Sequence, residues 1–204
     1  MKTKTTFADE YAEPPAGSAT ARANADELGI PVITPATAAV LTVAAKAVGA
    51  KQVVEVGTGT GVSALALLAG MAPEGTLTSI DPENDLQILA KETILAQGVA
   101  ARRFRPIAGR PLNVLPKLTD GAYDVVYVDG DPLEYVEYVA QAGRLLRSGG
   151  ALILHHALWK GQVADSDDDE PLIIREALAA VQESERYATA LIPLGDGLLL
   201  AVAD

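Results

Sequence analysis

The chain of 204 residues has no cysteine, and aromatic residues make up only 4% of it. Without cysteine there is no disulfide, no thiolate metal site and no thiol nucleophile. Basic residues are also scarce, 16 against 27 acidic ones, which gives a formal net charge of −11. Because phosphates repel an acidic chain and few aromatic rings can stack on bases, we expect no nucleic-acid partner.

Long apolar runs are missing too, although hydrophobic residues make up 49% of the sequence. The most apolar stretches, residues 36–48 and 62–72, are too short to span a bilayer. Residues 1–13 mix Lys, Thr, Asp and Glu and lack the apolar segment of a signal peptide. We therefore expect a cytoplasmic protein without a membrane partner, whose length suits one domain with a sizeable core.

Strand-like and helix-like patterns alternate along most of the chain. Short apolar runs predict strands, and helical spacing of apolar residues predicts helices. Such alternation is typical of a parallel α/β sheet with helices on both faces. The predicted strands are residues 52–56, 76–80, 103–107, 123–128 and 151–154, and the predicted helices are 34–48 (with Pro35 at its first position), 62–71, 84–97, 111–118, 133–147 and 172–183.

Glycine-rich and acidic segments separate several of these elements. We expect Ser148-Gly149-Gly150 to close the helix 133–147, as glycine often does. The acidic run 165–170 is interpreted as a solvated loop whose last acids favour the start of the next helix, not as a metal site. Residues 1–30 are predicted to form a helical or irregular appendage, and residues 31–204 the main domain.

The end of the sequence breaks the alternation. Residues 187–194 and 198–202 are predicted strands, joined by the turn Gly195-Asp196-Gly197. A parallel crossover needs a dozen or more residues, so these two strands must form an antiparallel hairpin.

A glycine-rich loop, Gly57-Thr58-Gly59-Thr60-Gly61, follows the first strand of the sheet. Ligands bind to open α/β sheets at such loops, because glycine lets the backbone approach a ligand and the next helix offers free N–H groups. A tight turn can need glycine for structural reasons alone. The dinucleotide fingerprint requires another glycine where this chain has Val62, which weakens an NAD interpretation.

Three polar side chains lie near this loop in the predicted fold. Asp81 ends the second strand, where a carboxylate can bind ribose hydroxyls or cap the following helix. Glu55 lies inside an apolar strand, and since burying a carboxylate is costly, we expect a cationic or donor-rich ligand nearby. Ser63 lies in the first helical turn, where its hydroxyl can reach a ligand or simply pack.

Together these residues resemble S-adenosylmethionine-dependent methyltransferases of class I. Residues 53–63 are similar to the family's first motif, and residues 77–81 to its ribose-binding second motif. The turn 129–131 and the run 194–199 resemble the catechol and caffeoyl-CoA O-methyltransferase branch, in particular small actinobacterial O-methyltransferases. The resemblance extends unbroken over residues 30–204. It implies a Rossmann-like, seven-stranded, mostly parallel sheet with an antiparallel last strand, a small-molecule methyl acceptor and a homodimer.

The resemblance also implies roles for individual positions. Asp129 would face the methyl acceptor, and Trp159 could form a wall of the acceptor pocket. The residues that would contact the cofactor are Glu55, Gly57, Thr58 and Ser63 at its methionine end, Asp81 at the ribose, Pro111 near the adenine, and Asp131 and Ile33, the latter through its backbone.

The chain departs from this branch at its metal site. There a divalent cation is held by the first aspartate of the turn, Asp129 here, and by a consecutive Asp-Asn pair that this chain replaces with His155 and His156. Mg²⁺ and Ca²⁺ prefer oxygen ligands, whereas imidazole suits Zn²⁺ or Fe²⁺. Adjacent residues near a strand end tend to point to opposite sides, so the two histidines are not expected to share an ion. We therefore predict no metal.

The base that removes the acceptor's proton must also differ. The branch has a lysine where this chain has Pro132, so His155 and His156 become the candidate catalytic bases. Each could instead only fill space at the rim of the pocket. We predict an S-adenosylmethionine-dependent O-methyltransferase acting on a small molecule, with a phenolic or catechol-like hydroxyl as one candidate acceptor. The alternatives are a cofactor-binding protein without catalysis and an NAD-dependent oxidoreductase.

Overall fold

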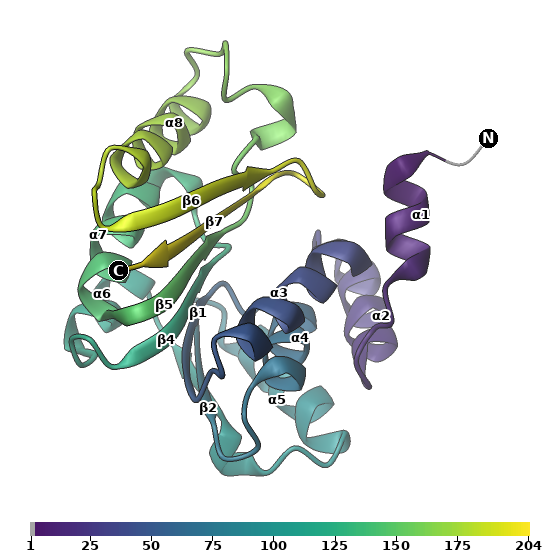
Figure 1. Ribbon diagram of the computed structural model, residues 1–204. Coiled ribbons are helices and arrows are strands. Elements are labelled where there is room, and N and C mark those ends of the chain that lie inside the picture. Colours follow the sequence, from purple (N-terminus) through teal and green to yellow (C-terminus); the bar gives the residue numbers. More distant parts are fainter. Residues whose placement is uncertain (1–2) are drawn as a thin grey trace.

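One sheet forms the centre of the molecule, with the strand order β3-β2-β1-β4-β5-β7-β6 (Figure 1). The computed structural model describes residues 3–204. Within that range six strands are parallel, and only β7 is antiparallel, pairing with β5 and β6. This confirms the predicted fold class. The strands are β1 (Gln52–Val56), β2 (Thr76–Asp81), β3 (Phe104–Ala108), β4 (Tyr123–Val128), β5 (Leu146–Leu154), β6 (Tyr187–Ile192) and β7 (Leu198–Ala203).

Helices cover both faces of this sheet, because successive strand residues point to opposite sides. Val53 packs in an apolar cluster that includes residues of α2 to α5, whereas Val54 packs in a second cluster with α7 and α8. Figure 1 shows α3, α4 and α5 on one side of the sheet and α7 and α8 on the other. The helices are α1 (Lys4–Tyr11), α2 (Ser18–Leu28), α3 (Pro35–Ala47), α4 (Val62–Gly70), α5 (Asn84–Ala96), α6 (Pro111–Val114), α7 (Tyr135–Leu145) and α8 (Asp169–Gln182).

The fifth strand begins earlier than its sequence predicts. The expected helix 133–147 ends at Leu145, and Ser148-Gly149-Gly150 lies inside β5 and does not close the helix. Leu146 pairs with Tyr123 of β4, and the register shifts before the next pair, so these residues form an irregular start of the strand. A bulge of this kind accommodates glycine well, which is why the local pattern resembles a helix end.

The last acids of the acidic run lie at the start of the next helix, as expected, although that helix begins three residues earlier than predicted. Helix α8 begins at Asp169, so the last two acids of the run, Asp169 and Glu170, form its first turn. Their negative charges lie at the positive end of the helix dipole, which stabilises this start. The short helix predicted at 111–118 is α6 followed by a single 3₁₀ turn, Leu115–Lys117.

Within residues 3–30, helices α1 and α2 account for most of the segment, joined by an irregular stretch at residues 12–17, as expected for it. Ala21 and Ala25 of α2 are fully buried, and the Thr60 hydroxyl donates a hydrogen bond to the Ala21 carbonyl over 2.8 Å. Helix α2 therefore packs directly behind the glycine loop. The domain boundary near residue 30 stays a prediction. No helix in the described part of the chain is both long and apolar enough to cross a membrane.

Candidate functional site

A cleft of about 320 Å³ lies at the carboxyl ends of β1, β2, β4 and β5. From β1 the chain first builds β2 and β3 on one side and then crosses to β4 on the other, so this is the switch point of the sheet. The cleft is lined by residues 30–33, the glycine loop, Asp81, Asp129 and the segment after β5. Ligands of open α/β sheets bind at this position.

The glycine loop comes close to the end of β4. Gly57 has a φ of 90°, and a Cβ atom placed there would overlap the backbone oxygen of Asp129. Only glycine therefore allows the loop to approach the end of β4 this closely. No side chain caps the N-terminus of α4, which begins after Gly61 at the back of the loop. Its first N–H groups are thus available to a ligand.

Asp81 braces this loop from the neighbouring strand. Its Oδ2 atom accepts hydrogen bonds from the backbone N–H groups of Thr58, over 2.9 Å, and Gly59, over 3.0 Å. Its Oδ1 atom accepts the N–H of Glu83 over 2.9 Å, so the capping interaction considered for Asp81 is present. Because a carboxylate oxygen can accept two hydrogen bonds, Oδ1 keeps acceptor capacity towards the cleft.

Glu55 is fully buried behind the loop, as its position in an apolar strand predicts. Its Oε2 atom accepts a hydrogen bond from the Ser79 hydroxyl over 2.5 Å, while Oε1 has no hydrogen-bond partner among residues 3–204. Burial raises the pKa of Glu55 to about 8, against the opposing effect of the Ser63 and Ser79 hydroxyls. A buried carboxyl with one free oxygen suits a ligand that brings a donor or a positive charge.

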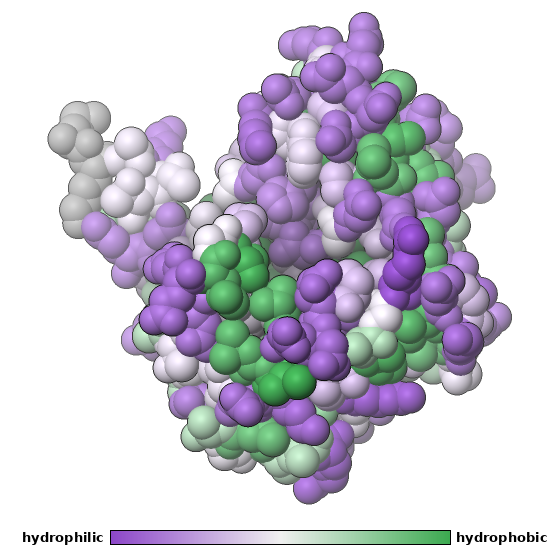
Figure 2. Space-filling view, turned by 180° about the vertical axis from the view of Figure 1, so that it is seen from behind, coloured by the Kyte–Doolittle hydropathy of each residue, from purple (hydrophilic) through white to green (hydrophobic). Residues whose placement is uncertain are grey.

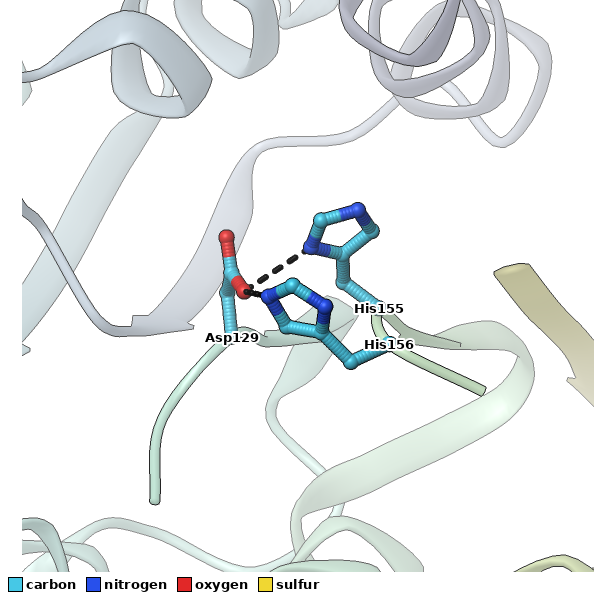
Figure 3. Close-up of side chains that lie close together, drawn as sticks. All are labelled: Asp129, His155 and His156. Atoms are coloured by element: carbon cyan, nitrogen blue, oxygen red, sulfur yellow. Dashed lines mark hydrogen bonds and ion pairs between the residues drawn. The ribbon is translucent and has the colours of Figure 1, made fainter. Parts of the chain in front are cut away.

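A second group of polar side chains gathers around Asp129 at the end of β4 (Figure 3). Its Oδ1 atom lies 2.9 Å from Nδ1 of His155 and 3.4 Å from Nε2 of His156, and its Oδ2 atom accepts the Tyr127 hydroxyl over 3.0 Å. Burial tends to raise the pKa of Asp129, but the hydrogen bond from His155 and the charge of both imidazoles outweigh it. The pKa therefore lies below its usual range. Asp129 is held as an anion.

The two histidines face the same carboxylate, which corrects the expectation that they point apart. Strand β5 ends at Leu154, so the alternation of a strand no longer applies to them. His156 has a left-handed backbone with a φ of 54°, and this turns its ring back towards His155, with 4.1 Å between ring centroids. Figure 3 shows both rings directed at Asp129. Potential ligand atoms of the three residues all lie within 4.8 Å of one another.

These three side chains do not fit the hard divalent cation that the catechol and caffeoyl-CoA O-methyltransferase branch binds at this position. Mg²⁺ and Ca²⁺ require six or more oxygen ligands or waters, whereas two of the three groups here are imidazoles. The Oδ1 atom of Asp129 already makes a hydrogen bond with Nδ1 of His155. The Nδ1 atom of His156 lies 2.7 Å from Oδ2 of Asp196. The side chains are thus paired with one another as proton donors and acceptors.

The histidines differ in how they meet the cleft. The side chain of His155 is only 7% exposed and that of His156 is 30% exposed. His155 is therefore a buried link between β4 and β5, while His156 presents its ring to the cleft beside Trp159, whose ring it meets edge-on at 5.5 Å. Asp196, the partner of His156, is the residue that sequence reasoning missed. The sequence indicates such a role only by a carboxylate in the hairpin turn that leads into β7, the strand that pairs with β5.

The remaining predicted residues divide between the cleft and its surroundings. Ile33 lines the cleft, and its carbonyl accepts a hydrogen bond from Arg22 over 2.7 Å. Trp159 lines it as well. In the described structure neither Pro111 nor Asp131 is among the lining residues. Pro111 is buried at the start of α6, and Asp131 is exposed and accepts the N–H of Leu133.

The sheet, its glycine loop and the carboxylates at its switch point define a nucleoside-binding enzyme of the Rossmann-like methyltransferase class. A family model described as O-methyltransferase matches residues 18–203. The chain belongs to this family. The predicted S-adenosylmethionine-dependent O-methyltransferase is thereby confirmed as the enzyme class, and the NAD-dependent alternative loses its support.

Individual relatives agree with this assignment. A protein of Mycolicibacterium smegmatis, named provisionally as an O-methyltransferase, is 47% identical over 188 residues, which are 91% of this chain and 90% of that protein. A solved protein of Corynebacterium glutamicum is 32% identical with a TM-score of 0.90, covering 97% of this chain and 94% of its own. A cofactor-bound structure from MTB is 26% identical with a TM-score of 0.89, and the match covers 100% of this chain and 98% of that one.

Proposed function

We propose that the chain methylates a hydroxyl group of a small molecule, with a phenolic or catechol-like compound as the acceptor, and that it does so without a hard divalent cation. One observation carries the proposal. A single cleft joins the glycine loop and Asp81, which suit a nucleoside cofactor, to Asp129 and His156, which suit the handling of a proton. The cofactor and the acceptor can then meet in one small space.

The cofactor half of the cleft matches the chemistry of S-adenosylmethionine. The free oxygen of Glu55 can receive the amino group of its methionine end, and the close backbone approach at Gly57 leaves room for it. The remaining acceptor capacity of Asp81 suits the ribose hydroxyls. Thr58, Ser63 and the backbone of Ile33 would complete this half. The MTB relative, solved with a cofactor bound, supports the assignment.

When bound, S-adenosylmethionine supplies an electron-poor methyl carbon, which leaves sulfur as the acceptor oxygen bonds to it and the bonding electrons stay on sulfur. The acceptor must lose its hydroxyl proton in this step. His156 is the accessible base, and its Nε2 atom can take that proton while Asp129 and Asp196 stabilise the resulting imidazolium. A positioned general base contributes about 10²- to 10⁴-fold in rate.

The size and charge of the site support a small acceptor. The whole cleft, with the cofactor half included, has a volume of about 320 Å³, which is small for a site that must hold two molecules. The carboxylates that line it and the net charge of −11 disfavour phosphate-rich polymers. The apolar wall offered by Trp159 and residues 30–33 suits a flat ring.

The decisive experiment combines binding and turnover. Calorimetric titration with S-adenosylhomocysteine should show binding to the wild-type chain, with and without Mg²⁺, and at least tenfold weaker binding to Asp81→Ala. Methyl transfer to a panel of phenols and catechols should then proceed in EDTA. Binding without transfer to any acceptor would instead support the alternative of a cofactor-binding protein, and a strict requirement for Mg²⁺ would contradict the proposed metal independence.

The homodimer and the cytoplasmic location belong to the same proposal. Figures 1 and 2 show α1 at the edge of the molecule, where Asp9 accepts the backbone N–H of Ala36 at the start of α3 over 3.0 Å. Its apolar side chains Phe7 and Tyr11 are 64% and 82% exposed, which supports a role in contacting a second copy. Light scattering tests this, since a single species of 21.2 kDa would contradict it. Cell fractionation tests the location.

A further inference from the structure

The hairpin turn between β6 and β7 reaches back to the mouth of the cleft. Both of its glycines have left-handed backbones, with φ values of 58° at Gly195 and 88° at Gly197. A Cβ atom at Gly197 would collide with Leu158, so the turn packs directly on the segment that follows β5. This contact brings Asp196, which lies between the two glycines, next to His156.

Asp196 holds the segment after β5 at three points. Its Oδ2 atom lies 2.7 Å from Nδ1 of His156, its Oδ1 atom accepts the backbone N–H of Lys160, and its own carbonyl accepts the N–H of Leu158 over 3.0 Å. The Asp196 side chain is only 22% exposed, so water competes weakly for these bonds. One residue thus ties together the loop that carries the candidate base.

That loop is strained and needs such support. The non-glycine residues with positive φ in residues 3–204 are His156, Trp159 and Lys160, with values of 54°, 42° and 57°. Left-handed backbone is unfavourable for such residues and persists only where surrounding contacts hold it, most often at functional sites. The contacts of Asp196 are made to two of these three residues.

We propose that Asp196 is a positioning residue for methyl transfer, which holds His156 as the Nδ1–H tautomer and directs its Nε2 atom at Asp129 and the acceptor. The inference rests on the proposed function, in which His156 is the general base, and names the residue that sets the tautomer of His156. An ionised carboxylate can only accept a hydrogen bond, so the ring nitrogen next to Asp196 must carry a proton. The other nitrogen, 3.4 Å from Oδ1 of Asp129, is then free to receive the acceptor's proton.

Among the contacts of His156 with the described residues, only the one with Asp196 favours this tautomer. Trp159 meets the ring only by its aromatic edge, and His155 meets it by a tilted stacking contact. Both contacts are compatible with either tautomer, because neither joins a hydrogen-bonding atom of the ring to a partner. Asp129 lies beside Nε2, and on its own it would favour a proton there and thus the opposite, unproductive tautomer. Asp196 opposes that preference.

The composition of the chain makes a direct test practical. There are two histidines in the whole sequence, so ¹⁵N-histidine labelling gives two ring spectra, and a His155→Gln variant assigns them. Long-range ¹H–¹⁵N spectra, recorded at a pH where both rings are neutral, distinguish the tautomers. We expect the wild-type His156 ring to carry its proton on Nδ1, and an Nε2–H ring would overturn the proposal without any variant being needed.

Three variants then separate charge, hydrogen bonding and shape. Asp196→Ala should move the His156 proton to Nε2, whereas Asp196→Asn, whose amide oxygen can still accept, should keep it on Nδ1. Asp167→Asn removes the same charge from the exposed acidic loop and should change neither ring. An unchanged tautomer in a folded Asp196→Ala chain would contradict the proposal.

Turnover provides the second readout, on any acceptor that the phenol panel identifies. We expect Asp196→Ala to lower kcat about 10- to 100-fold, a part of the contribution of a general base, while the KM for S-adenosylmethionine changes less than about twofold. Asp196→Asn should recover part of kcat. Wild-type kcat in Asp196→Ala would overturn the positioning role. If S-adenosylhomocysteine does not bind, the proposed function fails, whereas the tautomer result still stands on its own.

Discussion

The Nδ1 atom of His155 lies 2.9 Å from Oδ1 of Asp129, although 26 positions separate the two residues in the chain. The contact follows from the pairing of β4 with β5, in which Val128 lies opposite Leu154. Each residue is the first after its strand, so the sheet itself sets their separation. The same register places His156, the next residue, beside the cleft, and its left-handed backbone and Asp196 then set the direction of its ring.

The charge of Asp129 should matter more than its shape. We expect Asp129→Asn to lower kcat at least 100-fold, because a neutral amide no longer stabilises an imidazolium, a loss on the scale of a general base's contribution. Binding of S-adenosylhomocysteine should change less than about threefold. Tyr127→Phe is the matched control, since it removes the other hydrogen bond of Asp129 and keeps the charge. Equal turnover in Asp129→Asn and wild type would contradict this role.

Two glycines of the same loop should respond differently to an added methyl group. Gly57→Ala places a Cβ atom on the backbone oxygen of Asp129, and we expect the free energy of unfolding to fall by about 3 kcal/mol or more. Gly59 also has a positive φ, of 50°, but nothing lies within 4 Å of its Cβ direction. Gly59→Ala should therefore cost only about 1 kcal/mol. Urea unfolding of both variants measures the difference, and equal losses would show that the close approach is unimportant.

Glu55 should make the cofactor-free chain less stable as the pH rises. Its pKa is raised from 4.5 to about 8, so between these values the folded chain keeps a proton that the unfolded chain releases. The free energy of unfolding contributed by this group therefore falls across that interval. Each tenfold change in proton affinity corresponds to about 1.4 kcal/mol. Glu55→Gln removes the effect, so its stability relative to wild type should grow from pH 5 to pH 8 in urea titrations.

The same variant should bind the cofactor less well. A glutamine cannot give up a proton and become negatively charged when the amino group of S-adenosylhomocysteine binds, and we expect the Kd to rise about tenfold, as for the loss of one charged hydrogen bond. A chain that is more stable at pH 8 and yet binds less tightly would identify Glu55 as a ligand group and not a core residue. A stability difference that does not vary with pH would contradict the raised pKa.

Removal of Mg²⁺ or Ca²⁺ should leave turnover unchanged. One carboxylate and two imidazoles that already pair with Asp129 and Asp196 are a poor site for Mg²⁺ or Ca²⁺. We expect kcat in EDTA to equal kcat in added Mg²⁺ within about twofold. Loss of a metal that polarises the acceptor would lower kcat by much more than that. The reverse substitution provides a control: His155→Asp with His156→Asn restores the donors of the resembling branch and should introduce a response to Mg²⁺.

The cofactor half of the site could be predicted from the sequence because its parts are local. The glycine loop directly follows β1, and Asp81 ends β2, so strand order alone brings them together. The hairpin was predictable for a similar reason, since the length of a turn decides how its strands pair. In each case a short segment contains the whole of the physical argument.

The acceptor half depends on contacts that no short segment contains. The direction of His156 follows from a left-handed backbone that is held by Asp196, forty positions further along the chain. The start of β5 at Leu146 likewise depends on pairing with Tyr123, and its glycines alone are typical of a helix end. Tertiary contacts overrode the local pattern at both places.

The placement of β7 between β5 and β6 has a consequence for how the protein is made. During synthesis, residues 198–203 emerge from the ribosome after the other six strands of the sheet. They nevertheless occupy an interior place in it. The nascent chain therefore exposes the unpaired edge of β5 until β7 is made and pairs with it. A chaperone that shields open strand edges would therefore act on this protein until β7 pairs with β5.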